Sequence, residues 1–369
     1  MDQILYQAKK ELPLLTLIAL ACIAVTAHQF LQKPRRWNPR AYSCHFERKT
    51  QDPGVKTSPE HRSHETPGTS GEPLFLIPRF FREWRKDFLE FNAPHDQNGL
   101  VRGIFLGDAR AVARDSRDLF REAGLAHLLA ASGYNCWIVA FVFSLIAKLG
   151  ILVSGGLLDS RRHLKFKLIA PATAQLSGAW LFWMWTDQSP PITRAAVLIS
   201  LKFAIETLGH TVPFFRLLFV QYLCSLVIAP RLWMSASFQL TYGCLFGIVW
   251  VPQWVRAFRP SRNMFGQIVW DYYWSGLGAC LGALPTTWIV FQQVNFTSLL
   301  TNWFAVPIVS FGIMPVALLE MLLIPFSSLS FFNATATALA SVAAFLSDFL
   351  LGLLSFWMDH VPALIIHVS

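Results

Sequence analysis

Long apolar runs separated by short polar loops fill the chain after residue 124. The first run, residues 125–151, begins with polar and small residues and continues as an apolar segment long enough to cross a membrane. Comparable runs follow at residues 167–185, 192–208, 212–229, 233–251, 268–291, 296–325 and 334–357. Because a bilayer core about 30 Å thick takes about 20 apolar residues per crossing, we predict an all-α, polytopic membrane protein with about eight or nine transmembrane segments.

The run at residues 296–325 is too long for one comfortable crossing, and it contains Pro307 and Pro315. A proline inside a helix removes a backbone hydrogen-bond donor and clashes with the preceding turn. In a membrane, the freed backbone groups must face protein or water. We therefore predict that the helical bundle has one or two broken or re-entrant helices, and that this run is one of them.

The segments before residue 125 differ from one another in composition. Residues 12–30 are apolar and follow two lysines, which predicts an uncleaved membrane anchor within residues 1–32. The composition then changes to Pro, Gly, Ser, Thr and charge, which predicts a disordered polar linker. The chain is thus divided into an anchor, a linker, amphipathic interfacial helices, a membrane domain and a tail, at residues 1–32, 33–74, 75–124, 125–358 and 359–369.

Residues 79–91 combine aromatic and basic side chains in a helical pattern. The aromatic positions recur every three or four residues, at Phe81, Trp84, Phe88 and Phe91. The basic positions fall on the other side, at Arg82, Arg85 and Lys86. This pattern is typical of a basic amphipathic helix lying in the membrane interface. A compatible interpretation is that the aromatic face packs on the helices that follow.

The composition agrees with a membrane protein, since 54% of the residues are hydrophobic and 14% are charged. The net charge of +9 is explained by topology, because basic residues in short loops mark the cytoplasmic side. Basic residues gather at 161–167 and 256–262, which puts both loops in the cytoplasm and residues 33–124 outside. The six cysteines contain no CxxC pair, and they predict neither a disulfide framework nor a zinc site.

Polar residues inside the apolar runs are the candidates for function, because burying such groups in hydrocarbon is costly. His127, Ser132, Gly133 and Asn135 lie at the start of the first run. Arg194 lies near the start of another run and has no local partner of opposite charge. Further candidates either bond between helices or line a conduit, and these are Ser237, Gln239, Thr241 and Asn302.

Two other observations limit the chemistry. Lys202 and Glu206 are four residues apart on one helix, and we interpret them as a structural ion pair. The sequence contains no P-loop motif and no HExxH motif, so neither an ATP motor nor a zincin is predicted. We expect no cofactor and no metal.

Four sequence blocks resemble, in order, the competence-protein ComEC family of membrane channels that import single-stranded DNA. The first block is GDARAV followed by LFREAGLAHLLAASGYN, and the second is SPPITRAAVLISLKFAIETLGH. The third is APRLWMSASFQLTYGCLFGIVW, and the fourth begins ALPTTWIVFQQ and contains LLTNWFAVP. Four blocks in the same order are much more specific than any one of them.

The resemblance implies which residues form the channel motifs. The motif positions that match are His127, Ser132, Gly133, Arg194, Phe238, Gln239, Pro285, Asn302 and Pro307. The family pattern has a histidine where Asn135 stands, and an amide cannot titrate as a histidine does. About 40 polar residues take the place of the family's oligonucleotide-binding domain, too few for a five-stranded barrel, and no nuclease domain follows. We expect the channel domain alone.

The resemblance implies an inner-membrane permease that conducts single-stranded DNA into the cytoplasm during natural transformation, a conduit and not an enzyme. It also implies the lipid bilayer, a DNA-receptor protein, a cytosolic motor ATPase and a separately encoded nuclease as partners. Two alternatives stay open. One is a membrane-embedded enzyme that acts on a lipid or peptide with His127 and Ser132, and the other is a non-conducting remnant scaffold.

Overall fold

The computed structural model describes residues 78–130, 132–154, 160–186, 188–208, 210, 212–260, 263–361 and 365–367. The predicted anchor and polar linker lie outside these residues. The helices before the first long run are α3 (Arg79–Asn92), α4 (Leu100–Leu106), α5 (Arg114–Glu122) and the 3₁₀ turn η2 (Ala126–Leu129). The helices that follow are α6 (Gly133–Ser154), α7 (Ser160–Trp185), α8 (Pro190–Thr207), α9 (Phe214–Ile228), α10 (Ala236–Trp254), α11 (Met264–Phe291), α12 (Thr297–Pro307), α13 (Met314–Leu323) and α14 (Ser330–His360).

Short elements join or extend these helices. The 3₁₀ turns η3 (Pro230–Met234) and η4 (Arg256–Phe258) lie before and after α10, and η6 (Ile324–Phe326) follows α13. Strand β1 (Gln293–Asn295) pairs antiparallel with β2 (Ile365–His367), and this pairing brings the end of α11 beside the C-terminal end of the described chain. Helix α5 ends at Glu122 and its C-cap is Ala123; Gly124 follows with a φ of 74°, the left-handed conformation that glycine adopts readily.

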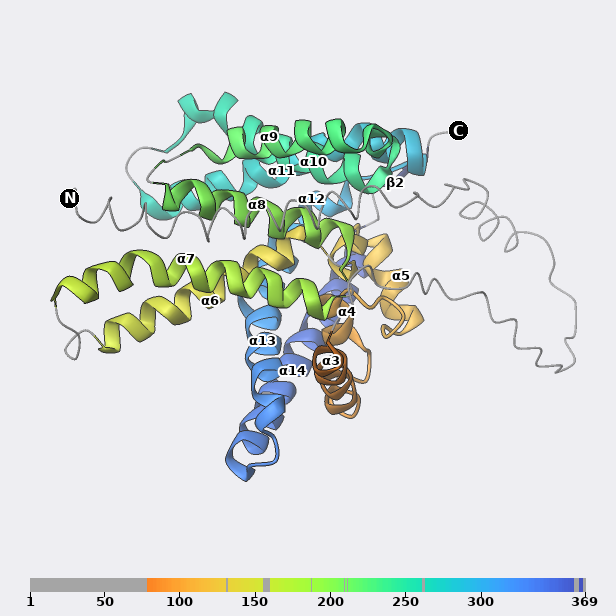
Figure 1. The fold of residues 1–369 in the computed structure, drawn as a ribbon. Helices are drawn as coiled ribbons and strands as arrows, with labels where there is room; N and C mark the ends of the chain where they lie inside the picture. The colour runs from red at the N-terminus through yellow and green to blue at the C-terminus, as the bar shows by residue number, and fades with distance from the viewer. Residues whose placement is uncertain are drawn as a thin grey trace, which may run out of the picture.

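The helices pack mainly as neighbouring pairs, and the pairs run in different directions. Helices α6 and α7 form one hairpin, α10 and α11 a second, and α13 and α14 a third. In Figure 1 the first two hairpins run across the view, with α8 between them, while α13 and α14 run downwards and α3 lies beside them. The largest core cluster unites residues of α4, α6, α7, α8, α13 and α14. The segments of the first and second sequence blocks therefore meet in this cluster, whereas Phe238 of the third block belongs to a second, smaller cluster.

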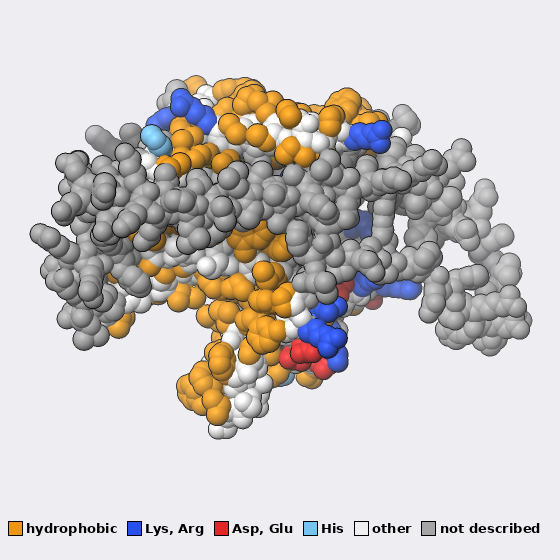
Figure 2. All heavy atoms as spheres, in the orientation of Figure 1, with side chains coloured by type: hydrophobic (Ala, Val, Ile, Leu, Met, Phe, Trp, Pro, Cys, Tyr) orange, Lys and Arg blue, Asp and Glu red, His pale blue; other side chains and the backbone are white. Residues whose placement is uncertain are grey.

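Three of the described helical segments are long and apolar enough to cross a membrane, namely Gly133–Val153, Thr297–Phe326 and Ser330–His360. Large apolar side chains are exposed on them, such as Phe311 at 81% and Phe345 at 68%. On the face drawn in Figure 2, hydrophobic side chains gather over α9–α11 and along α13 and α14. These surfaces fit a lipid environment. The predicted helical class is confirmed, whereas the count of eight or nine crossings stays a prediction.

The run at residues 296–325 is not broken in the way that its prolines suggested. Helix α12 continues through a π-helical turn, Ile308–Ile313, into α13, so that Thr297–Phe326 forms one continuous helical segment. Pro307 lies directly before the π turn, and Pro315 lies in the first turn of α13, directly after it. The prediction of a broken or re-entrant helix here is thus wrong in form, because a local π turn accommodates the proline without reversing the chain.

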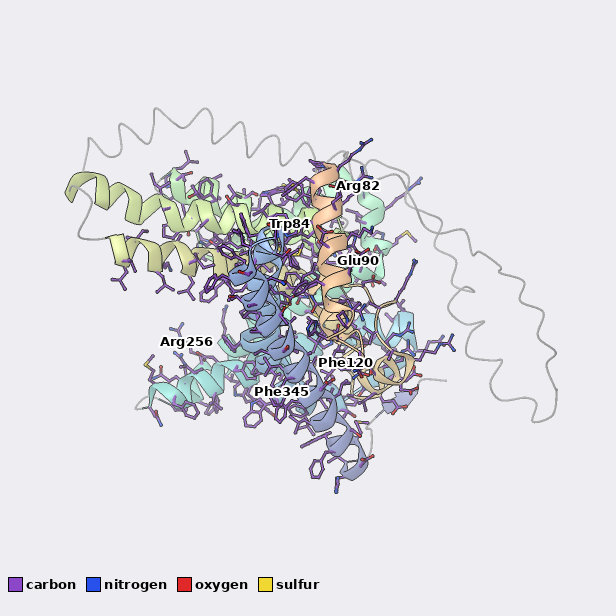
Figure 3. All side chains as sticks on the ribbon, turned by 90° about the horizontal axis from the view of Figure 1, so that it is seen from below. Arg82, Trp84, Glu90, Phe120, Arg256 and Phe345 are labelled. Atoms are coloured by element: carbon purple, nitrogen blue, oxygen red, sulfur yellow. The ribbon has the colours of Figure 1, made fainter. Side chains whose placement is uncertain are left out.

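Helix α3 packs on the bundle through its aromatic face. Phe88 is fully buried, and the indole Nε1 of Trp84 donates a hydrogen bond of 2.6 Å to the carbonyl oxygen of Met321. The Trp84 ring also meets the edge of Trp185 at a centroid distance of 4.9 Å. Arg82 and Glu90 lie on the exposed side, as the view from below shows (Figure 3). The structure therefore confirms the packing interpretation of the aromatic stripe.

Four glycines bring α10 and α11 into backbone contact. A Cβ atom added to Gly247 would lie 1.9 Å from the carbonyl oxygen of Gly278, and one added to Gly278 would lie 2.2 Å from that of Gly247. Gly243 and Gly282 face each other in the same reciprocal way, at 2.4 and 2.0 Å. Small residues four apart on both helices allow this close approach. The α10–α11 hairpin therefore depends on positions without side chains.

Candidate functional site

Arg194 is buried between three helices. The Pro190–Pro191 pair starts α8 with a backbone geometry that suits the first helical turn, and Arg194 follows on that turn with 4% of its surface exposed. Its Nη2 donates hydrogen bonds to α10, reaching the Ser237 carbonyl oxygen at 3.1 Å, the Ser237 Oγ at 3.1 Å and the Thr241 Oγ1 at 2.7 Å. The two hydroxyls that the sequence suggested as inter-helix bonding residues thus hold the arginine.

An aromatic cluster flanks the guanidinium group. The Cζ atom of Arg194 lies 6.0 Å from the centroid of the Phe238 ring, at the outer limit of a cation–π contact. Phe238 is 1% exposed and packs against Tyr242 at 4.6 Å and Tyr222 at 5.6 Å between ring centroids. The Arg194 backbone carbonyl also accepts a 2.6 Å hydrogen bond from Gln221 Nε2 of α9. Helices α8, α9 and α10 together fix the position of the arginine.

The positive charge of Arg194 has no carboxylate beside it. No ion pair between the described residues includes Arg194, and its Nε is buried without a hydrogen-bond partner. On the same helix, Lys202 and Glu206 form a 2.7 Å ion pair, which confirms the structural role predicted for them. An isolated buried charge is costly unless something compensates it. The described residues therefore leave the Arg194 charge without a compensating anion.

The residues at the start of α6 shape the neighbourhood of α8. A Cβ atom on Gly133 would lie 3.2 Å from the Pro191 carbonyl oxygen, so the two helix starts pack tightly. The Ser132 Oγ accepts a 3.2 Å hydrogen bond from the Asn135 backbone N–H, which is the role of a helix N-cap. His127 is exposed on η2. No hydrogen bond or ion pair among the described residues joins His127 to Ser132, although the two are close in sequence.

Asn135, where the family pattern has histidine, is 1% exposed and joins α6 to α4. Its Nδ2 donates a 2.9 Å hydrogen bond to the carbonyl oxygen of Ile104, and its Oδ1 is buried without a partner. This amide thus stabilises the contact between two parts of the largest core cluster. Its structural role needs a donor and does not need a titrating group.

The remaining motif residues lie away from Arg194. Gln239 Nε2 donates a 2.7 Å hydrogen bond to the Trp233 carbonyl oxygen at an exposed position, and Pro285 is exposed on α11. The Asn302 carbonyl oxygen accepts a 2.9 Å hydrogen bond from the Tyr272 hydroxyl. Of the predicted site residues, the structure thus brings Arg194 and Phe238 together and sets Gln239, Pro285, Asn302 and Pro307 elsewhere.

A large aromatic cavity lies between α11, α12 and α14, close to the segment that carries Asn302. Its volume is about 590 Å³, and its aromatic lining includes Trp270, Trp274, Trp303 and Trp357. Such rings offer flat faces for stacking, which do not depend on the identity of a base. Aromatic side chains thus gather at this cavity as well as around Phe238.

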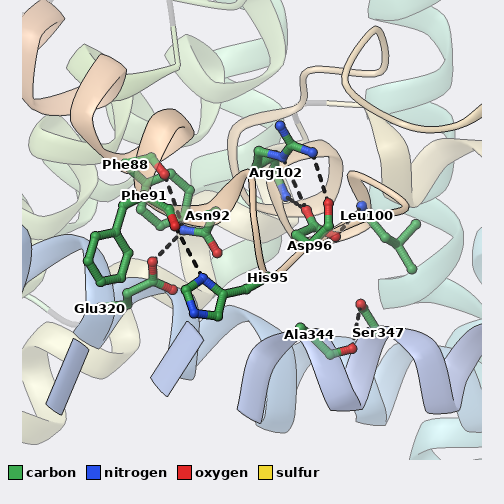
Figure 4. A network of polar contacts seen from close by, with 10 residues as sticks. All are labelled: Phe88, Phe91, Asn92, His95, Asp96, Leu100, Arg102, Glu320, Ala344 and Ser347. Carbon is green, nitrogen blue, oxygen red and sulfur yellow. Dashed lines mark hydrogen bonds and ion pairs between the residues drawn. The ribbon is translucent and has the colours of Figure 1, made fainter. Parts of the chain in front are cut away.

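A buried carboxyl group was missed from the sequence. Glu320 of α13 is 0% exposed, and one of its oxygens accepts a short hydrogen bond from Asn92 Nδ2 of α3 (Figure 4). Asp96 follows α3 and pairs with Arg102 Nε at 3.3 Å, while its other oxygen accepts the Leu100 N–H at 2.8 Å. A lone acidic residue in the apolar run 296–325 was the signal that could have identified Glu320.

The fold and this site define a class of protein, an α-helical membrane protein whose bundle holds an uncompensated buried arginine beside aromatic rings. The chain belongs to the Competence protein family, whose match covers residues 104–369. The resemblance seen in the four sequence blocks is thereby confirmed.

Two relatives are similar to part of this chain. ComE operon protein 3 of Bacillus subtilis (strain 168) is 26% identical over 248 residues, which is 66% of this chain. The Uncharacterized protein YcaI of Escherichia coli (strain K12) is 24% identical over 230 residues, or 62% of this chain. In each case the matched region is 29% of the relative's own length. No solved structure matches this chain.

Proposed function

We propose that this chain is an inner-membrane permease that conducts single-stranded DNA into the cytoplasm during natural transformation. The observation that carries the proposal is the buried Arg194 charge, which faces neutral hydroxyls and an aromatic ring instead of a carboxylate. A single strand supplies the two complementary groups, since phosphates pair with guanidinium and bases stack on rings. Membership of the Competence protein family supports the same function.

The way in which Arg194 is held suits transient binding. Thr241 Oγ1 donates its own hydrogen to the Ser237 carbonyl at 2.8 Å and accepts from Arg194 with a lone pair. When a phosphate accepts the hydrogen bond that Arg194 donates to Thr241, the Thr241 Oγ1 still donates its own hydrogen and is only left with a free lone pair. This costs less than leaving a donor unpaired. Arg194 can therefore exchange between its resting partners and successive phosphates without disturbing α10.

The proposed function is a conduit and not a catalyst. Ser132 is used as the N-cap of α6, so the proposal gives it no role as a nucleophile. The free energy for transport has to come from outside the described chain, and we propose a cytosolic motor ATPase for that role. A DNA-receptor protein and a separately encoded nuclease would deliver the strand and degrade its complement.

The test is uptake of labelled donor DNA into the cytosol of cells that depend on this protein. We expect Arg194→Gln to lower uptake by about tenfold or more, since a charge-assisted contact to phosphate is lost. The matched control is Arg216→Gln, which removes an exposed arginine from α9 and the same unit of charge. Immunoblots of membrane fractions would establish that both variants are present in equal amounts. Normal uptake with Arg194→Gln would remove this residue from the path, and normal uptake after deletion of the gene would refute the function.

A further inference from the structure

A second cavity lies where α5 and η2 meet the turn that leads into α8. It has a volume of about 370 Å³ and lies beside the start of the first long run. Its lining combines two arginines, one hydroxyl and small apolar side chains, namely Arg117, Arg121, Ser189, Gly107, Ala109, Ala126, Leu129 and Ala130. Arg117 lies in none of the four sequence blocks, Arg121 lies in the first of them, and neither belongs to the site around Arg194.

Two polar groups of this cavity, on Arg117 and Ser189, have no hydrogen-bond partner among the described residues. No carboxylate among the described residues pairs with Arg117, whose Nε is buried without a hydrogen-bond partner. The hydroxyl of Ser189 is also buried and unpartnered within the described part of the chain. Arg121 pairs with Asp118 at 3.0 Å, but both side chains are more than half exposed, so this ion pair is weak. The cavity therefore offers unsatisfied donors.

Its position relates it to Arg194. Ser189 directly precedes α8, and Arg194 lies five residues further along the same helix. With a rise of about 1.5 Å per residue, the two positions are separated by roughly 7 Å along the α8 axis. A polyanionic strand that reaches the cavity would thus lie within one or two helical turns of the Arg194 guanidinium group.

We propose that this cavity binds a backbone phosphodiester of single-stranded DNA and presents the strand to the Arg194 site. The proposal rests on the function proposed above and identifies where the strand first contacts the membrane domain. A phosphodiester carries one charge and several acceptor oxygens, which matches two guanidinium groups and a hydroxyl.

The experiment measures binding of a fluorescein-labelled oligo-thymidine strand to the full chain in nanodiscs of neutral lipid. We expect Arg117→Gln to weaken binding by about tenfold and to reduce the slope of log affinity against log salt by about 0.7, the value for one lost contact to a single strand. Arg114→Gln is the matched control, because this arginine is exposed on the same helix and does not line the cavity. Its affinity and slope should stay close to those of the unchanged chain.

A structural role for Arg117 would lower affinity through misfolding and would leave the salt slope unchanged. If Arg117→Gln fails to fold, Arg121→Gln replaces it, with the same expectation for the slope. Unaltered affinity and slope in the cavity variants would overturn this site and leave the conduit intact, because the conduit is tested separately by uptake with Arg194→Gln. Preferential loss of binding to vesicles of anionic lipid, with oligonucleotide binding retained, would instead identify a headgroup site and overturn the proposal.

Discussion

Replacing Gly247 by alanine tests the backbone contact between α10 and α11. The new Cβ would lie 1.9 Å from the Gly278 carbonyl oxygen, and both atoms belong to helices that cannot rotate away. Relieving the clash requires the two helices to separate by at least about 1 Å, and overpacking of this kind costs about 1–3 kcal/mol. The reciprocal pair Gly243 and Gly282 would also lose contact. A gap of this size removes a quarter to a half of the dispersion attraction between the atoms that face it.

The assay is thermal unfolding in detergent, followed by intrinsic tryptophan fluorescence. Gly247→Ala should lower the apparent Tm by a few degrees, as expected for a loss of about 1–3 kcal/mol in a chain of this size. Gly276→Ala is the matched control on α11, because a Cβ there meets nothing within 4 Å. Alanine favours helix by about 1 kcal/mol over glycine, so the control should melt at the same temperature or higher. Equal melting temperatures for the two variants would refute backbone contact between α10 and α11.

Two further predictions concern buried polar groups, with the same melting assay. Asn135→Ala leaves the Ile104 carbonyl without its donor and should lower stability by about 1–3 kcal/mol, whereas an unchanged Tm would mean that the α6–α4 bond contributes nothing. Glu320→Gln keeps an acceptor for the Asn92 amide and should change Tm little, while Glu320→Ala should cost about 2–4 kcal/mol; equal effects of the two variants would contradict the pairing.

The sequence was informative where the signal is local. The four aromatic positions of α3 predicted a buried stripe, and Phe88 is indeed fully buried. The four-residue spacing of Lys202 and Glu206 predicted their ion pair, because residues that far apart share one helix face. In each case the pattern and its physical cause lie within two helical turns.

The parts that could not be predicted depend on which helices meet. Arg194 binds Ser237 and Thr241, which are 43 and 47 residues away in sequence. Glu320 binds Asn92 over a separation of 228 residues. Helical periodicity shows which side of a helix is apolar, but it does not identify the neighbour that covers that side. The partners of buried polar groups therefore emerge only from the tertiary structure.

The two kinds of charge on α8 show why we regard Arg194 as functional. Lys202 and Glu206, whose side chains are 34% and 42% exposed, pair with each other, whereas Arg194, 4% exposed, binds only neutral oxygens such as Ser237 Oγ and Thr241 Oγ1. If stability alone decided where charges pair, the buried arginine would need a carboxylate most, because its desolvation costs most. The opposite arrangement leaves a buried guanidinium without an anion among the described residues, and this is why we propose that the phosphates of a passing strand bind it.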